Sequence, residues 1–152
     1  MTTITSVNQI ERSLRSISGM LKQKGREILT NYPITPPQFQ ALQWLKEKGD
    51  LTIGELSHKL YLACSTTTDL VDRLEKNDLV RRVRDENDRR VVRIHIMDEG
   101  MRVITEVIEK RQAYLADILN GFEEADIPFI AKVLEKLDDS MAADRTRAKA
   151  LK

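Results

Sequence analysis

The spacing of apolar residues differs in one segment of this chain, and this difference limits the folds that the chain can adopt. Nearly everywhere the apolar side chains recur every three or four residues, which is the period of an amphipathic helix. Within residues 79–97 the period becomes two, because Val92, Ile94 and Ile96 alternate with polar residues. We therefore predict a mainly α-helical protein with a small β-hairpin wing.

Two helices are predicted in the first third of the chain. The first, over residues 7–28, has apolar residues at alternating spacings of three and four. The second is predicted to start at the cap Thr35, with Gln38 reaching back as in a capping box, and to end near Glu47. Its buried stripe is expected to contain Phe39, Leu42 and Leu45.

A helix-turn-helix is predicted next. Residues 53–60 indicate a short helix that ends near Tyr61, and a further helix follows almost at once, up to Lys76. Two short helices joined by a tight turn, the second with a polar outer face, are typical of this motif. The expected buried stripe of the second helix is Thr67, Leu70, Val71 and Leu74, and its expected outer face is Ser65, Asp69, Asp72 and Lys76, flanked by Thr68 and Arg73.

A β-hairpin is predicted after this helix. Asp78 is expected to close the helix in a left-handed conformation, a role usually given to glycine. Strands are predicted over residues 79–84 and 91–97, around the polar turn 85–88.

Two more helices are predicted to complete the chain. The first is expected to be capped by Asp98, and the second to begin near Asp126 and carry its apolar seam as far as Met141. The charged tail 142–152 is expected to fray.

Positive charge is concentrated at the predicted hairpin, although the formal net charge of the chain is only +1. Residues 79–97 carry six arginines against three acidic residues, whereas residues 98–152 carry nine basic against twelve acidic residues. A basic strip on a balanced protein is typical of a surface that binds phosphates. The strip therefore predicts a surface that meets the phosphates of a nucleic acid.

The composition excludes several other classes of protein. We expect one domain from 152 residues, and a cytoplasmic location, because no apolar run is long enough to cross a membrane and residues 1–7 lack the pattern of a signal peptide. The chain has no glycine-rich phosphate loop and no cluster of His, Cys and carboxylate residues, so we expect neither an enzyme nor a cofactor. His58 and His95 lack further ligands at metal-binding spacing, so no metal site is expected.

Two stretches of the chain resemble the MarR family of bacterial winged helix-turn-helix regulators. Residues 68–82, Thr-Asp-Leu-Val-Asp-Arg-Leu-Glu-Lys-Asn-Asp-Leu-Val-Arg-Arg, are similar to the family's recognition helix, and residues 85–90, Asp-Glu-Asn-Asp-Arg-Arg, to its Asp-x-Arg wing. Before Gly100, Met97-Asp98 replaces the Leu-Thr of the family's helix start. Asp78 replaces the usual glycine, and Asp69 stands where relatives often carry arginine.

The resemblance implies double-stranded DNA as the partner, and a set of contacts with it. The polar face of the recognition helix is expected to read bases in the major groove, and Arg90 to enter the minor groove while Asp88 holds an arginine in place. Asp69 puts the family's usual sequence preference in doubt, since a carboxylate near phosphates lowers affinity unless it accepts from cytosine or positions an arginine. The expected contacts are Ser65, Thr66, Thr67, Thr68, Asp69, Arg73, Lys76, Arg84, Asp88, Arg89 and Arg90.

The resemblance also implies an assembly and a mode of regulation. We expect a single domain, 1–152, with a DNA-binding lobe over about 35–97 and a helical dimerisation region over about 4–31 and 98–145. A homodimer is expected to bind a pseudo-palindromic operator, with half-sites roughly 10 bp apart, as a repressor that a small-molecule effector releases. The family's effectors suggest a small aromatic or phenolic compound.

Several roles stay open on the sequence alone. Tyr32 and Trp44 could line the effector cleft or could be packing residues. Cys64 is expected to be an ordinary cysteine, with a thiol-responsive regulator as the alternative, because it precedes the recognition helix. A winged helix that binds another protein is the remaining alternative, and the arginine-rich wing argues against it.

Overall fold

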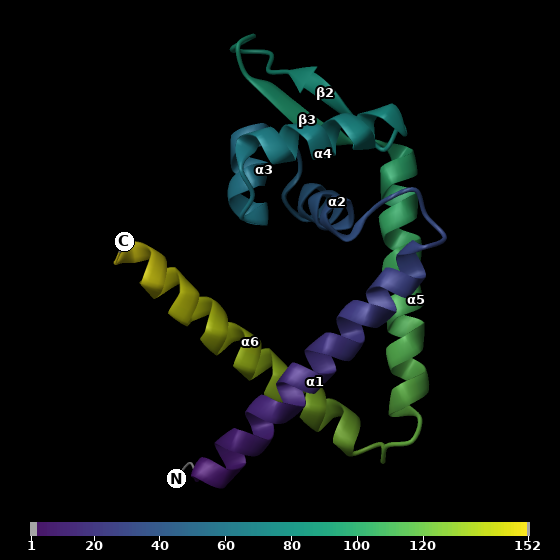
Figure 1. The fold of residues 1–152 in the computed structure, drawn as a ribbon, viewed down its shortest axis with the longest axis vertical. Coiled ribbons are helices and arrows are strands. Elements are labelled where there is room, and N and C mark those ends of the chain that lie inside the picture. Colours follow the sequence, from purple (N-terminus) through teal and green to yellow (C-terminus); the bar gives the residue numbers. More distant parts are fainter. Residues whose placement is uncertain (1–2, 152) are drawn as a thin grey trace. The chain divides into compact units, whose positions relative to one another are not determined.

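The computed structural model describes residues 3–151, so Met1, Thr2 and Lys152, the ends of the predicted domain and tail, lie outside the described residues. The chain divides into two compact units, residues 1–111 and 112–152. The elements, labelled in Figure 1, are α1 (Ile4–Leu29), α2 (Pro36–Lys48), β1 (Leu51–Thr52), α3 (Ile53–Leu60), α4 (Cys64–Lys76), β2 (Val80–Arg84), β3 (Val92–Ile96), α5 (Asp98–Leu119) and α6 (Asp126–Ala150).

The first two helices each begin after a threonine whose side chain caps the helix. The side chain of Thr3 accepts from the backbone N–H of Ser6 at the start of α1. At α2 the predicted capping box is confirmed: Thr35 Oγ1 accepts from the Gln38 backbone N–H, and Gln38 Oε1 accepts from the Thr35 N–H. Only the last part of α1 is buried, at Gly25, Ile28 and Leu29. In the single chain, most of the predicted apolar seam of α1 is therefore exposed to solvent.

The predicted helix-turn-helix is confirmed as α3 and α4. Thr52 caps α3 with a capping box that includes Glu55. The turn after α3 is tight because Tyr61 adopts a left-handed conformation, with φ 57°, and the Leu62 N–H donates to the Ser57 carbonyl at 3.1 Å. A left-handed non-glycine residue costs about 1 kcal/mol. The turn that separates the two helices is thus held by the packing around it.

The wing is part of a three-stranded antiparallel sheet in the order β1-β3-β2. Val80 pairs with Ile96 and Arg84 with Val92, so the strands sit within one residue of their predicted bounds. Asp78 has φ 61°, as predicted. Figure 1 shows the β2–β3 hairpin projecting beyond α2, α3 and α4.

The hydrophobic core of the first unit joins the helix-turn-helix to the sheet. It is built from the end of α1, from α2, α3 and α4, from the three strands, and from the first half of α5. Leu42, Leu56, Leu74, Ile94 and Ile104 are fully buried. The predicted stripes of α2 and α4 are all buried. This core holds α4 in a fixed position beside the wing.

The start of α5 packs very closely on the sheet. A Cβ added at Gly100 would lie 2.3 Å from the Leu79 carbonyl oxygen and 2.9 Å from Ile96 Cγ1. Only glycine leaves room for this approach. The prediction that Asp98 caps α5 is wrong by one position, because Asp98 is itself the first helical residue and the Met101 N–H donates to the Met97 carbonyl.

The second unit contains the end of α5 and all of α6. The prediction that the tail frays from residue 142 is wrong, because α6 continues to Ala150. Alanines with high helix propensity fill this segment, and Asp144 pairs with Arg147 one turn later. In residues 3–151 the structure contains no helix of the length and apolarity that a membrane crossing requires.

Candidate nucleic-acid interface

The outer face of α4 is polar and exposed. The buried stripe of the helix faces the core, so Ser65, Asp69 and Lys76 lie on the opposite side, flanked by the exposed Thr66 and Arg73. Ala63 at the N-cap makes no side-chain cap hydrogen bond. The N-terminal end of α4 therefore presents backbone N–H groups that no capping side chain occupies.

Two of the predicted threonine contacts have other roles. Thr67 is 0% exposed, and its hydroxyl donates to the Ala63 carbonyl at 3.0 Å. The prediction that Thr67 belongs to the buried stripe is confirmed, and the prediction that it contacts DNA is wrong, because it packs in the core one helical turn from Leu70 and Val71. Thr68 is half-buried, and its hydroxyl donates to the Cys64 carbonyl at 2.9 Å.

The wing tip is organised by two aspartates. Asp85 Oδ2 accepts from the backbone N–H groups of Asn87 and Asp88, at 3.1 and 3.0 Å. Asp88 Oδ1 accepts from the backbone N–H and from Nε of Arg90, at 3.1 and 3.2 Å. The prediction that Asp88 holds an arginine is confirmed. The side chain of Arg90 is nevertheless 91% exposed, so its guanidinium is oriented while it remains accessible.

Two other arginines of the wing have different surroundings. Arg84 Nη1 donates to the carbonyl of Arg89 at 2.9 Å, which supports the backbone across the wing. Arg84 and Arg89 are both exposed. The structure therefore brings Arg84, Asp88, Arg89 and Arg90 together at one end of the hairpin, as the sequence predicted.

Arg82 joins the wing to α4. Its Nη2 lies 2.7 Å from Asp72 Oδ1 and its Nη1 2.7 Å from Glu75 Oε1, while Glu75 Oε2 accepts from the Arg82 backbone N–H. Burial disfavours the charged guanidinium, but the hydrogen bonds to the two carboxylates outweigh burial and raise the pKa of Arg82. These contacts fix β2 against the exposed side of α4.

Arg93 joins the wing to α3. Its Nε lies 3.3 Å from Asp85 Oδ1 and its Nη1 3.4 Å from Glu55 Oε1. The pKa of Asp85 is held below its ordinary value by the backbone N–H of Asp88, by Arg93 and by the backbone N–H of Asn87. The pKa of Glu55 is lowered chiefly by its hydrogen bonds with the Thr52 backbone and hydroxyl. Both carboxylates are thus charged where they brace the wing.

The roles of these bracing residues were not predicted from the sequence. Arg82 and Arg93 counted only as members of the basic strip, and their partners lie between 7 and 38 residues away along the chain. The usable signal in the sequence was the alternation of side chains along the two strands, which determines the face of the sheet on which Arg82 and Arg93 lie. Carboxylates of α3 and α4 lie beside them. Two of the six arginines of the strip are therefore committed to ion pairs that hold the wing.

Cys64 is the first residue of α4 and is exposed. Its Sγ lies 3.4 Å from Ser57 Oγ, whose hydroxyl also donates to the Gly54 carbonyl. The thiol therefore lies at the α3–α4 junction, next to the polar face of α4.

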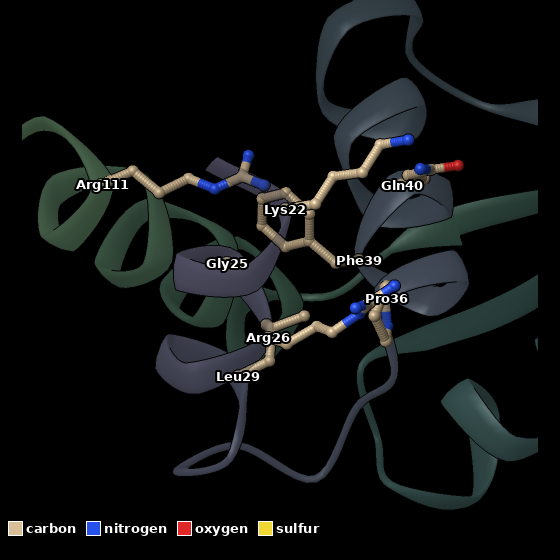
Figure 2. A pocket seen from close by; sticks show the side chains of 8 residues that line it. All are labelled: Lys22, Gly25, Arg26, Leu29, Pro36, Phe39, Gln40 and Arg111. Atoms are coloured by element: carbon tan, nitrogen blue, oxygen red, sulfur yellow. The ribbon is translucent and has the colours of Figure 1, made fainter. Parts of the chain in front are cut away.

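A cavity of about 250 Å³ lies between α1 and α2 of the first unit. Figure 2 shows the guanidinium of Arg111 reaching toward the Phe39 ring, whose centroid is 4.9 Å from the guanidinium carbon, and the Arg26 side chain extending toward Pro36. Three side chains are cationic and none is acidic among its lining residues: Lys22, Gly25, Arg26, Leu29, Pro36, Phe39, Gln40 and Arg111.

Tyr32 and Trp44 do not line this cavity. Both are half-buried against the core. The ammonium of Lys110 lies 4.9 Å from the Tyr32 ring centroid, and that of Lys59 lies 4.7 Å from the Trp44 centroid. These contacts favour the packing role for both aromatic residues.

Comparison with known proteins identifies the family. The model of the MarR family matches residues 34–92, which run from the start of α2 to the wing. YsmB of Bacillus subtilis, an uncharacterised HTH-type transcriptional regulator, is 62% identical over 135 residues, covering 89% of this chain and 92% of that protein. The chain belongs to the MarR family. It is a helix-turn-helix transcriptional regulator, as the resemblance predicted, and its family relatives are regulators and not enzymes.

Solved structures show the same fold for this MarR-family regulator. A MarR family protein from Bacillus stearothermophilus is 58% identical, with a TM-score of 0.88, over 93% of this chain and 99% of that one. FabT of Streptococcus pneumoniae, solved in complex with DNA, is 24% identical with a TM-score of 0.76, over 90% and 98%. These likenesses confirm the predicted winged helix-turn-helix fold of the MarR-family chain.

Proposed function

We propose that this regulator binds a pseudo-palindromic operator as a homodimer, with α4 in the major groove and Arg90 in the adjacent minor groove. The observation that carries the proposal is the shared support of the two elements. Arg82 ties the wing to α4, and Arg93 ties it to α3, so the helix and the wing tip are presented together. A helix fits the major groove of B-DNA, and an exposed arginine suits the negative potential of a narrow minor groove.

The exposed chemistry supports DNA as the partner. Arg73 and Lys76 on α4 and Arg84, Arg89 and Arg90 on the wing are exposed and positive. The open N-terminal end of α4 adds backbone donors of the kind that contact phosphates. FabT, which shares the fold, was solved in complex with DNA, which supports DNA as the partner here. Because its target would be the chromosome, we place the regulator in the cytoplasm.

The homodimer is proposed from apolar side chains that each unit leaves exposed. In the first unit they follow α1, at Ile4, Val7, Ile10 and Ile17. In the second unit they are Ile118, Phe122, Phe129, Val133, Leu134 and Met141. Contiguous exposed apolar side chains are typical of protein interfaces. We propose that a second copy covers them, so that the helical regions outside residues 35–97 form the dimer interface.

Repression and release are the remaining parts of the proposal. A dimer on the operator would occlude polymerase, and an effector would stabilise a spacing of the α4 helices that does not match the half-sites. The cavity at Phe39 supports an effector with an apolar, aromatic body and a negative charge, because three cations surround an apolar floor. A phenolate fits the small aromatic or phenolic effector that we expect.

The test is selection of bound duplexes from a random DNA pool at near-physiological salt. Wild type is expected to enrich an inverted repeat. Arg90→Ala should fold and dimerise but lose the enrichment. Arg81→Ala is the matched control, because Arg81 is an exposed arginine of the same hairpin away from its tip. Failure of folded wild type to enrich any sequence would contradict the proposal.

A further inference from the structure

The three carboxylates of α4 have different surroundings. Asp72 and Glu75 are both bound by Arg82, each at 2.7 Å. Asp69 is exposed, and within residues 3–151 the structure gives its side chain no hydrogen-bond or ion-pair partner. Two of the acidic side chains therefore brace the wing, and one is left facing outward.

Asp69 does not hold a neighbouring arginine in place. Arg73 stands one helical turn later, at the spacing that favours an ion pair, yet the described contacts include none between Asp69 and Arg73. Both side chains line a shallow groove at the edge of α4, together with Thr66 and Pro37. Of the two explanations for an acid at this position, arginine positioning is not seen among the described contacts, which leaves base contact.

An unpaired carboxylate on this face needs a donor on the DNA. Phosphates repel it, and a carboxylate can only accept hydrogen bonds. In the major groove, guanine presents acceptors at O6 and N7 and thymine an acceptor at O4, so both disfavour an acid. Adenine presents a donor beside the N7 acceptor, whereas cytosine presents its N4 amino group as a donor. Cytosine is thus the base that suits a carboxylate best.

We propose that Asp69 is a specificity-determining residue, which accepts a hydrogen bond from the N4 amino group of one cytosine in each half-site. The inference rests on the proposed function, because it requires α4 to lie in the major groove. The position of Asp69 near the middle of the exposed face places this cytosine within the stretch of bases that α4 covers.

The experiment compares sequences selected by wild type, Asp69→Asn and Asp69→Ala from the same random pool. Wild type should enrich cytosine at one position of each half-site. Asp69→Asn should move that preference toward adenine, because an amide can pair with both N6 and N7, and Asp69→Ala should lose it. On isolated duplexes, replacing this cytosine should weaken wild type by roughly 5- to 150-fold and Asp69→Ala by much less.

Glu86→Gln is the matched control for simple charge repulsion. Glu86 is an exposed acid of the wing, so its removal should raise affinity for all duplexes while the selected motif stays the same. If Asp69→Ala selects the wild-type motif, cytosine included, or if the base that changes is not cytosine, this inference is wrong and the proposed function stands. If folded wild type selects no motif, both fail.

Discussion

Replacing Gly100 with alanine is expected to destabilise the protein, although alanine is the better helix former. The new Cβ would lie 2.3 Å from the Leu79 carbonyl oxygen and 2.9 Å from Ile96 Cγ1. Backbone cannot rotate away as a flexible side chain can, so the start of α5 must move off the sheet. The same carbonyl accepts from the Met97 N–H at 2.9 Å, and this hydrogen bond would lengthen.

The size of the effect follows from three contributions. Overpacking costs about 1–3 kcal/mol, and weakening a buried hydrogen bond costs about 1 kcal/mol. The helix propensity of alanine offsets about 1 kcal/mol of this. The expected loss in the free energy of unfolding is therefore about 2 kcal/mol.

Gly19→Ala is the matched control. Gly19 is also a helical glycine, but an added Cβ would meet no atom within 4 Å, and the position lies on the side of α1 opposite its apolar seam. That variant should gain about 0.5–1 kcal/mol. Urea unfolding at one fixed chain concentration measures both variants. A Gly100→Ala protein as stable as wild type would refute the close packing of α5 on the sheet.

Three further predictions concern the wing and α2. Arg82→Ala should lower the free energy of unfolding by about 1 kcal/mol, because the side chain is partly exposed. It should also weaken operator binding, measured by fluorescence anisotropy; unchanged binding would contradict its bracing role. Thr35→Ala should cost about 1 kcal/mol through loss of the capping box, and an unchanged melting temperature would argue against that cap. Because the pKa of Asp85 is lowered, its contribution is present above its ordinary value of 3.8 and is lost as pH falls further. The stability difference between wild type and Asp85→Asn should therefore shrink in thermal melts from neutral to acidic pH, and a growing difference would contradict the assignment.

Local sequence signals predicted most of the elements. The capping box joins Thr35 to Gln38, three residues later, so the sequence shows both partners. The left-handed conformation of Asp78 after α4 is likewise a local property of the chain. The apolar period likewise separated the wing from the helices, because burial on one face has a fixed repeat.

The predictions were wrong or incomplete where a residue's role depends on contacts between elements that are distant in the sequence. Arg93 meets Glu55 across 38 residues, and no local pattern encodes such a pair. Thr67 was expected both in the buried stripe and among the DNA contacts, and its backbone hydrogen bond allows it to be buried. The cavity at Phe39 depends on the packing of α1 against α2, so its lining residues were not predicted.

The dependence of operator affinity on salt concentration tests DNA binding through α4 and the wing most directly. With the selected operator, the logarithm of the wild-type association constant should fall linearly with the logarithm of salt concentration. In Arg90→Ala the slope should be smaller in magnitude by roughly 2, because each cation removed from the DNA lowers it by about 0.9 and the proposed homodimer would have two wings. A salt-independent affinity, or the same slope in both proteins, would contradict DNA binding by this surface.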